Sequence, residues 1–232
     1  MALFALGDLH LAFQRPEKSM DAMGPVWVRH EEKIWKNCQE LVKPEDTLVL
    51  LGDHSWGRKM SQCREDLDFI ARLPGRKILL RGNHDMFWQA SQTERLNRQF
   101  SGRLEFLQNN FFAYGAYALV GTKGYCFEGK DSEEHFLKLR NREVNRLRRS
   151  FDLAREAGYC KFIMFLHYPP TSIGEQKSPF TCLAEEYGAE KVIYSHCHGK
   201  ERYDDSFKGN VNGVEYKLVS SDYLKFIPER IL

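Results

Sequence analysis

Carboxylate, imidazole and amide side chains stand in five short groups along the chain, and each group follows an apolar run. The groups are Asp8 with His10, Asp53, Asn83 with His84 and Asp85, His167, and His196 with His198. Oxygen and nitrogen ligands of these kinds suit borderline ions such as Mn²⁺, iron and Zn²⁺, and they argue against Ca²⁺ or a cysteine-held structural zinc. The set is too large for one ion and about sufficient for two ions that share a carboxylate.

The apolar runs before these groups predict buried strands. They are residues 2–6, Thr47–Leu51, Lys77–Leu80, Lys161–Leu166 and Lys191–Tyr194. Ligand sites of open α/β sheets lie at the carboxyl ends of the strands, so we expect the five groups to meet in one place. A lone aspartate after glycine is usually a turn residue, and a lone buried histidine is usually a core residue. The prediction therefore depends on the repetition of the pattern.

Amphipathic segments separate the early strands. Val26–Val42 and Ser61–Leu73 carry apolar residues at helical spacing, and Phe87–Phe100 predicts a third helix. His30 within the first is expected to be a surface or hydrogen-bonded residue. Strands that alternate with helices at short spacing predict parallel strands joined by helical crossovers.

The second half of the chain begins with short β-type runs at 106–107, Phe111–Tyr114 and Tyr117–Val120. A long charged helix is predicted over 132–157, followed by a loop and helix over 169–188. The arginines of the long helix allow two interpretations. We favour a solvent-exposed face stabilised by i,i+4 pairs over a basic surface that borders an anionic substrate. Near the C-terminus, Asn212-Gly213 favours a type I′ hairpin turn.

Composition predicts one soluble globular domain over residues 1–232. The chain has 42% hydrophobic and 28% charged residues, and the net charge of +2 disfavours a nucleic-acid partner without excluding it. The six cysteines form no CxxC pair, which is typical of reduced thiols in an intracellular protein. The sequence has no signal peptide and no apolar run of about 20 residues, so we expect a cytoplasmic location and no membrane partner.

Taken in order, five motifs resemble those of the calcineurin-like metallophosphoesterase superfamily. They are Asp8-x-His10, Gly52-Asp53, Gly82-Asn83-His84-Asp85, His167 and His196-x-His198. The sequence around these motifs is similar to that of a bacterial branch of predicted phosphohydrolases. The resemblance implies an α/β fold, namely a four-layer α/β/β/α sandwich with a dinuclear metal site at the C-terminal ends of the strands.

The resemblance also implies a ligand set for two divalent or mixed-valence ions, with Mn, Fe or Zn expected. By it, Asp8, His10, Asp53 and His198 hold the first metal, and Asp53, Asn83, His167 and His196 hold the second, with Asp53 bridging. The sequence departs from the family pattern at two places. Ser195 stands where the last motif usually has glycine, and His54 to Gly57 follow Asp53 where many relatives have an acid or amide. We expect His54 to pack rather than to touch the substrate.

The implied activity is metal-dependent hydrolysis of a phosphate ester, in which a metal-bridging hydroxide attacks phosphorus in line. His84 would act as general acid and Asp85 would orient it. Arg81 would either contact phosphate or form a structural ion pair, and both readings stay open.

The rival hypothesis is a catalytically inactive scaffold of the same fold that binds proteins. Such scaffolds tend to lose the catalytic histidine or several ligands, and this chain keeps all of them. Monoester and diester substrates and the oligomeric state stay open. Trp56, Phe87, Trp88 and the arginine-rich helix would permit a nucleic-acid substrate but do not require one.

Overall fold

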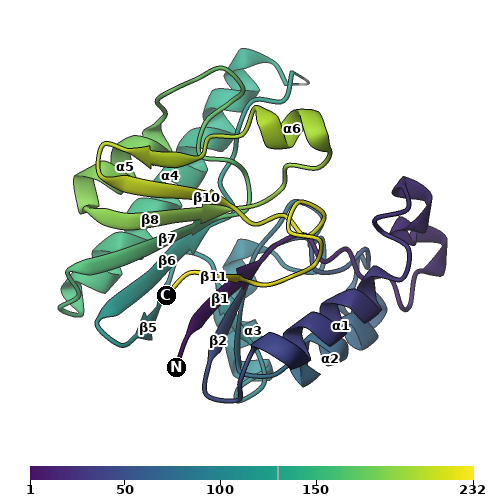
Figure 1. Cartoon of the computed structure of the whole chain (residues 1–232). Coiled ribbons are helices and arrows are strands. Elements are labelled where there is room, and N and C mark those ends of the chain that lie inside the picture. Colours follow the sequence, from purple (N-terminus) through teal and green to yellow (C-terminus); the bar gives the residue numbers. More distant parts are fainter. Residues whose placement is uncertain (130) are drawn as a thin grey trace. The chain divides into compact units, whose positions relative to one another are not determined.

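The computed structural model describes residues 1–129 and 131–232 and has an α/β fold (Figure 1). It contains two parallel-rich sheets flanked by helices, as the resemblance implies. The chain divides into two compact units: unit 1 comprises Met1–Phe106 and Val219–Leu232, and unit 2 comprises Leu107–Leu218. Each unit is described separately, and the single domain stays a prediction.

The sheet of unit 1 has the strand order β11-β1-β2-β3-β4. Its strands are β1 (Leu3–Leu6), β2 (Thr47–Leu51), β3 (Arg76–Leu80), β4 (Glu105–Leu107) and β11 (Glu229–Arg230). The first three are parallel neighbours, as predicted, with Leu3 opposite Thr47 and Thr47 opposite Arg76. Their carboxyl ends therefore lie at one edge of this sheet. The short strand β11, which the sequence did not predict, runs antiparallel to β1.

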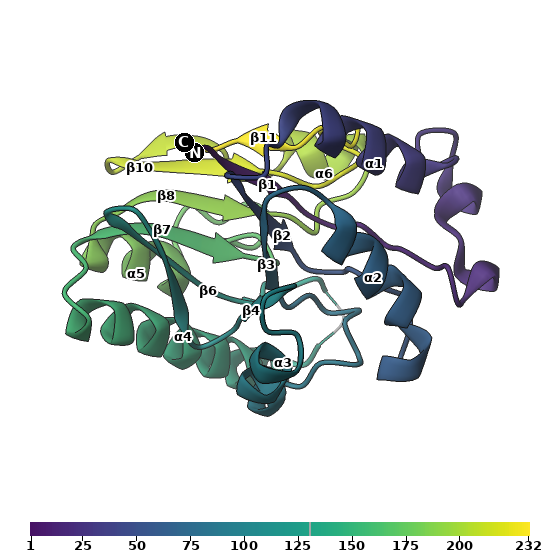
Figure 2. The ribbon, with the colours of Figure 1, turned by 90° about the horizontal axis from the view of Figure 1, so that it is seen from below.

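The α-helices of unit 1 are α1 (His30–Leu41), α2 (Arg64–Arg72) and α3 (Thr93–Gln99). Short 3₁₀ turns occupy Pro16–Lys18, Met20–Met23, Met60–Gln62 and Ala90–Gln92. Helices α1 and α2 lie side by side (Figure 2), with the Trp35 and Phe69 ring centroids 5.6 Å apart. Their apolar faces join one core cluster with Leu48 and Leu50 of β2.

All three α-helices of unit 1 are shorter than the sequence pattern predicted. Helix α2 begins at Arg64 rather than Ser61, after the 3₁₀ turn Met60–Gln62, and ends one residue early. Helix α1 begins at His30 rather than Val26, because Arg29 has a left-handed backbone with φ of +53°. Helix α3 is confined to the second half of the predicted segment. In the first half Trp88 is buried and its indole donates a hydrogen bond to Thr93 Oγ1 at 3.1 Å. Packing of this ring replaces the first helical turns.

The sheet of unit 2 has the strand order β5-β6-β7-β8-β10-β9. Its strands are β5 (Phe111–Tyr114), β6 (Tyr117–Thr122), β7 (Lys161–Leu166), β8 (Ala189–Tyr194), β9 (Gly209–Val211) and β10 (Val214–Leu218). The four inner strands are parallel, and the two edge strands are antiparallel hairpin partners. The second hairpin turn has Asn212 and Gly213 at φ of +53° and +83°, the left-handed pair that the sequence predicted.

Helices α4 (Glu133–Glu156), α5 (Pro179–Tyr187) and α6 (Lys200–Asp204) complete unit 2. Helices α4 and α5 cover one face of its sheet (Figure 2), and their buried side chains share a core with β6, β7 and β8. Helix α6 was not predicted. Among residues 1–129 and 131–232, no helix combines the length and the apolar composition that a membrane crossing requires.

The arginines of α4 contact residues of their own unit. The Arg146 guanidinium lies 2.6 Å from the buried carboxylate of Glu143, and Arg148 pairs with Glu186 at 2.5 Å. Arg155 covers the ring of Tyr187 at 3.9 Å. These arginines are therefore paired, as predicted, but through an i,i+3 contact and through contacts with α5 rather than through i,i+4 pairs.

We expect Asp46 to link the stability of unit 1 to pH. Its carboxylate accepts hydrogen bonds from the backbone N–H groups of Ala2 (2.6 Å) and Lys43 (2.9 Å), which hold the pKa of Asp46 below its usual range. Because the pKa is lower in the folded than in the unfolded state, this stabilisation is present above the unfolded pKa. It is lost as pH falls through the folded pKa.

Asp46→Asn should therefore lower the free energy of unfolding near neutral pH and flatten its decline on acidification. Urea unfolding between about pH 7 and pH 2.5 measures both quantities. Glu45→Gln removes the exposed neighbouring carboxylate and is the matched control. Identical pH slopes for Asp46→Asn and the parent protein would contradict the assignment.

Candidate metal centre

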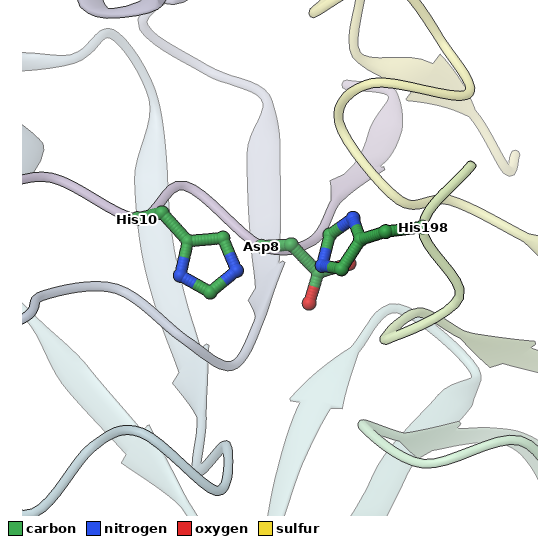
Figure 3. A group of neighbouring side chains, drawn as sticks. All are labelled: Asp8, His10 and His198. Carbon is green, nitrogen blue, oxygen red and sulfur yellow. The ribbon is translucent and has the colours of Figure 1, made fainter. Parts of the chain in front are cut away.

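Three loops of unit 1 carry predicted ligands at the edge where β1, β2 and β3 end. Asp8 and His10 project from the loop after β1, as Figure 3 shows. Asp53 follows β2, and its backbone carbonyl accepts from the His10 N–H at 2.7 Å. Nε2 of His10 lies 3.8 Å from Oδ2 of Asp53. The structure therefore brings together the three unit 1 residues that the sequence proposed for the first metal.

These side chains are buried and their backbone is strained. Asp8, His10 and Asp53 are each at most 3% exposed. Their φ angles of +59°, +46° and +51° lie in the left-handed region, which costs on the order of 1–3 kcal/mol for a non-glycine residue. Burial of a carboxylate also costs free energy unless the charge is compensated. The surrounding structure holds all three in place despite these costs, which is typical of a functional site.

Asp85 is fully buried, and it connects the loops after β2 and β3. Its carboxylate accepts backbone N–H groups of Gly82 (2.7 Å), Asp53 (3.0 Å) and His54 (2.9 Å), and it lies 3.0 Å from the Nδ1 atom of His54. Burial alone raises the pKa of Asp85, but the His54 imidazole and the N–H donors outweigh it and hold the pKa low. Asp85 therefore fixes the loops after β2 and β3, and its role in orienting His84 stays a prediction.

His84 is attached to this framework through its backbone. Its N–H donates to Oδ1 of Asp53 at 2.8 Å. Its ring centroid lies 4.4 Å from that of Trp56 and 5.8 Å from that of His10. The Trp56 ring in turn stacks on His10 at 5.0 Å. The imidazole is thus positioned beside two proposed ligands, and its role as general acid stays a prediction.

Other residues that the sequence singled out have structural partners. His54 is buried against Asp85, as expected, and the two ring nitrogens of His30 lie 2.9 and 3.1 Å from backbone carbonyl oxygens of Leu9 and Trp27. The Arg81 Nε–H donates to the carbonyl of Trp88 at 2.5 Å.

The aromatic residues weighed for a nucleic-acid site are mostly unavailable for stacking. Phe87 and Trp88 are buried, and Trp56 is engaged with two imidazole rings. This burial weakens the hypothesis of a nucleic-acid substrate, since stacking needs an accessible ring face.

In unit 2, two predicted histidines meet at the ends of β7 and β8. Nδ1 of His196 lies 3.2 Å from Nε2 of His167, and the rings are perpendicular within about 20°, with an interplanar angle of 69°. His196 has a left-handed backbone with φ of +72°. His198 follows in the same loop and is labelled in Figure 3. Two imidazole nitrogens at this separation suit neighbouring ligands of one ion.

Glu128 is a contact of this site that the sequence analysis missed. Its Oε1 atom lies 3.0 Å from Nε2 of His196. The residue belongs to the loop between β6 and α4, and it follows no apolar strand. A search for polar groups at strand ends therefore had no means of finding it.

Taken unit by unit, the donors fit metal ions. Unit 1 offers carboxylate oxygens and an imidazole at the end of its parallel strands, and unit 2 offers imidazole nitrogens at the end of its own. Such N/O sets suit Mn, Fe and Zn ions. No thiolate is needed.

Comparison with known proteins agrees with this chemistry. The family model described as calcineurin-like phosphoesterase matches residues 1–200. A curated relative, the Gene 66 protein of Mycobacterium phage D29, is 34% identical over 93 residues, which are 38% of this chain and 45% of the phage protein. The match thus spans less than half the length of that relative.

Solved structures share the fold at low sequence identity. Phosphopantetheinyl hydrolase (PptH) from Mycobacterium tuberculosis matches with a TM-score of 0.61 and 14% identity, over 100% of this chain and 95% of that one. A protein of unknown function, AQ665 from Aquifex aeolicus, matches with a TM-score of 0.54 and 17% identity, over 99% and 95% of the two chains. A putative 5′-nucleotidase from Staphylococcus aureus matches with a TM-score of 0.53 and 11% identity, over 94% of this chain and 48% of the nucleotidase chain.

Gly82→Ala should displace Asp53. A Cβ at this position would overlap the backbone nitrogen and the Oδ1 atom of Asp53, and neither can move without breaking its loop. Overpacking of this kind costs about 1–3 kcal/mol, and we expect metal content to fall as well. Urea unfolding and elemental analysis measure the two effects. Gly102→Ala, at φ of +77° with nothing within 4 Å, adds a methyl group without steric overlap and should leave metal content unchanged.

Asp85→Asn should destabilise the fold. The new NH₂ group would face backbone N–H donors, and the charge that compensates His54 would be lost, so we expect a cost of about 3–5 kcal/mol in unfolding free energy. Asp68→Asn, which removes an exposed partner of Arg103, should cost under about 1 kcal/mol. An Asp85→Asn protein of unchanged stability and reduced turnover would contradict this expectation and would support the prediction that Asp85 orients His84.

Proposed function

Because the chain belongs to the calcineurin-like phosphoesterase family, we propose that it hydrolyses phosphate esters with two metal ions and with His84 as general acid. The family itself supports phosphoester hydrolysis. Among the proteins of similar fold, two are named as a hydrolase and a putative nucleotidase, which is in keeping with this reaction class. We propose, beyond this general activity, the number of metal ions, the residues that bind them and the identity of the general acid.

The proposed first ion takes Asp8, His10, Asp53 and His198, and the proposed second ion takes Asp53, Asn83, His167 and His196. Within unit 1, Nε2 of His10 lies 3.8 Å from Oδ2 of Asp53, and within unit 2, Nδ1 of His196 lies 3.2 Å from Nε2 of His167, which supports the two halves of this set. Asn83 and the bridging role of Asp53 come from the motif resemblance. Mn, Fe and Zn are the ions that this N/O donor set favours.

The observation that carries the proposal is backbone strain at the ligands. Asp8, His10, Asp53 and His196 all have left-handed φ angles although none is glycine. Each such residue costs on the order of 1–3 kcal/mol, and strained residues cluster where function requires them. In the part of the chain that the structure describes, four of the seven proposed ligands carry this cost.

In the proposed mechanism, the two ions would supply Lewis acidity that activates water and withdraws charge from the phosphoryl oxygens. Asp53 uses Oδ1 to accept the backbone N–H of His84, and its Oδ2 faces His10. The acid is therefore fixed relative to the bridging carboxylate by a single hydrogen bond. His84 protonates the leaving oxygen, and the Trp56 ring limits the rotation of its imidazole.

The second candidate function, an inactive scaffold that binds proteins, is disfavoured by the same observation. A scaffold has no use for strained, buried ligands, and substitutions that relieved the strain would stabilise it. The chain retains every ligand and His84.

We expect Asp53→Ala to lose both metal and activity, and His84→Ala to keep metal while losing turnover by roughly 10²–10⁴-fold. The assay is hydrolysis of aryl and bis-aryl phosphates with Mn²⁺, Fe²⁺ or Zn²⁺, alongside elemental analysis and a chelator-treated sample. His135→Ala removes an exposed histidine of α4 and should match the parent protein.

Full activity of His84→Ala would remove His84 from the mechanism. Absence of turnover by the parent protein with every metal and both probe classes would favour the scaffold.

A further inference from the structure

The two histidines of unit 2 face each other, and each has a second polar partner on its other side. Nε2 of His196 lies 3.0 Å from Oε1 of Glu128, and Nδ1 of His167 lies 3.3 Å from Oγ of Ser195. The inner atoms, Nδ1 of His196 and Nε2 of His167, are 3.2 Å apart. The four groups form one chain of polar contacts.

The outer partners decide which ring nitrogen carries the proton. An ionised carboxylate only accepts hydrogen bonds, so Nε2 of His196 must donate to Glu128, and Nδ1 of the neutral ring is left with a lone pair. The Ser195 hydroxyl lies 3.5 Å from the carbonyl oxygen of His167 and 3.3 Å from its Nδ1 atom, and we infer that it donates to the carbonyl and accepts from Nδ1–H. Nε2 of His167 is then also a lone-pair nitrogen.

Two lone pairs at 3.2 Å repel each other unless a cation lies near both. This arrangement is unfavourable in an ordinary core and favourable at a metal ion. A carboxylate on the far nitrogen of a ligand histidine also fixes the ring and raises its basicity.

We propose that Glu128 and Ser195 are positioning residues that set the tautomers of His196 and His167, so that both rings present a ligating nitrogen to the same ion. The proposal rests on the proposed function and concerns only its second ion. Neither residue belongs to the ligand set. Ser195 occupies the position where the motif resemblance expects glycine, so its hydroxyl is a feature of this chain.

The loop that carries Glu128 is anchored on both sides of it. The Phe127 N–H donates to Oγ of Ser172 at 3.1 Å, and the Tyr125 hydroxyl donates to Asp131 at 2.5 Å. The Tyr125 ring also packs edge-on against Tyr168, next to His167, at 5.3 Å. Glu128 is thereby held in place by its neighbours and not by His196 alone.

Partial burial strengthens the hydrogen bond between the Glu128 carboxylate and His196. The side chains of His196 and Glu128 are 15% and 28% exposed, so their hydrogen bond is partly shielded from water. Ser195 is fully buried, and its backbone N–H also donates to the carbonyl of His167 at 3.1 Å. The serine thus contacts both the ring and the backbone of the ligand that it positions.

The test compares Glu128→Ala, Glu128→Gln and Ser195→Gly with the parent protein. Chelator-stripped protein is titrated with Mn²⁺ by calorimetry, which resolves two sites if their affinities differ. Glu128→Ala should weaken one site by roughly 10–100-fold and leave the other unchanged. Glu128→Gln should lose less, because its amide oxygen still accepts from Nε2–H of His196. Ser195→Gly should weaken the same site.

Glu190→Ala is the matched control, since Glu190 is an exposed carboxylate at the opposite end of β8, where it accepts from the Tyr117 hydroxyl. Unaltered Mn²⁺ affinity of Glu128→Ala at both sites, or an equal loss in Glu190→Ala, would overturn the inference.

A second readout needs no metal. The ¹⁵N shifts of His196 in the stripped protein should report the Nε2–H tautomer, and Glu128→Ala should move them toward a mixture. An Nδ1–H tautomer in the parent protein would overturn the inference. Should the parent protein bind none of Mn²⁺, Fe²⁺ and Zn²⁺, the proposed function fails, whereas this measurement still tests the contact between Glu128 and His196.

Discussion

One buried carboxylate holds the loops of unit 1 in their strained form. Asp85 collects N–H groups from the loops after β2 and β3 and pairs with His54, and each of these contacts is removed from water. The close approach of Gly82 to Asp53 is possible because glycine has no side chain. Hydrogen bonds to a charged acceptor can each contribute on the order of 1.5–3 kcal/mol. Their sum is of the size needed to offset left-handed backbone at Asp8, His10 and Asp53.

The two units use the same local arrangement with different supporting chemistry. In unit 1, the proposed ligands are two carboxylates, one imidazole and one amide, and the loops after β2 and β3 are held by backbone hydrogen bonds to the Asp85 carboxylate. In unit 2, the proposed ligands are imidazoles, and the rings of His167 and His196 each have a polar partner on the outer nitrogen. Carboxylates need positioning alone, because either oxygen can bind. Imidazoles need positioning and the correct tautomer, which accounts for the extra partners.

The sequence predicted the strands and the residues at their ends, because apolar runs that end in polar groups are a local signal. Strand β2 and strand β7 match their predicted limits at both ends. Properties that depend on contacts between residues far apart in the sequence could not be predicted from local patterns. Asp85 accepts hydrogen bonds from donors about 30 residues away in the sequence, and no local pattern reports these partners. Glu128 reaches His196 across 68 positions of sequence, and a lone glutamate carries no pattern. The start of α1 was set by the backbone of one residue, Arg29, which hydrophobic periodicity does not report.

The pairing of β1 with β11 has a consequence for the order of events during synthesis. Residues 219–232 return to unit 1, where Gly7 donates to the Val219 carbonyl, Ser221 donates to the Gly7 carbonyl, and Ile231 donates to Leu3. Strand β1 therefore waits for more than 200 further residues to be synthesised before its edge beside β11 is covered. During translation that edge is a row of exposed donors and acceptors, open to pairing with other nascent chains. Because the turn of the Asp8 loop rests on the same contacts, we expect it to reach its final form only after residues 219–232 have been made.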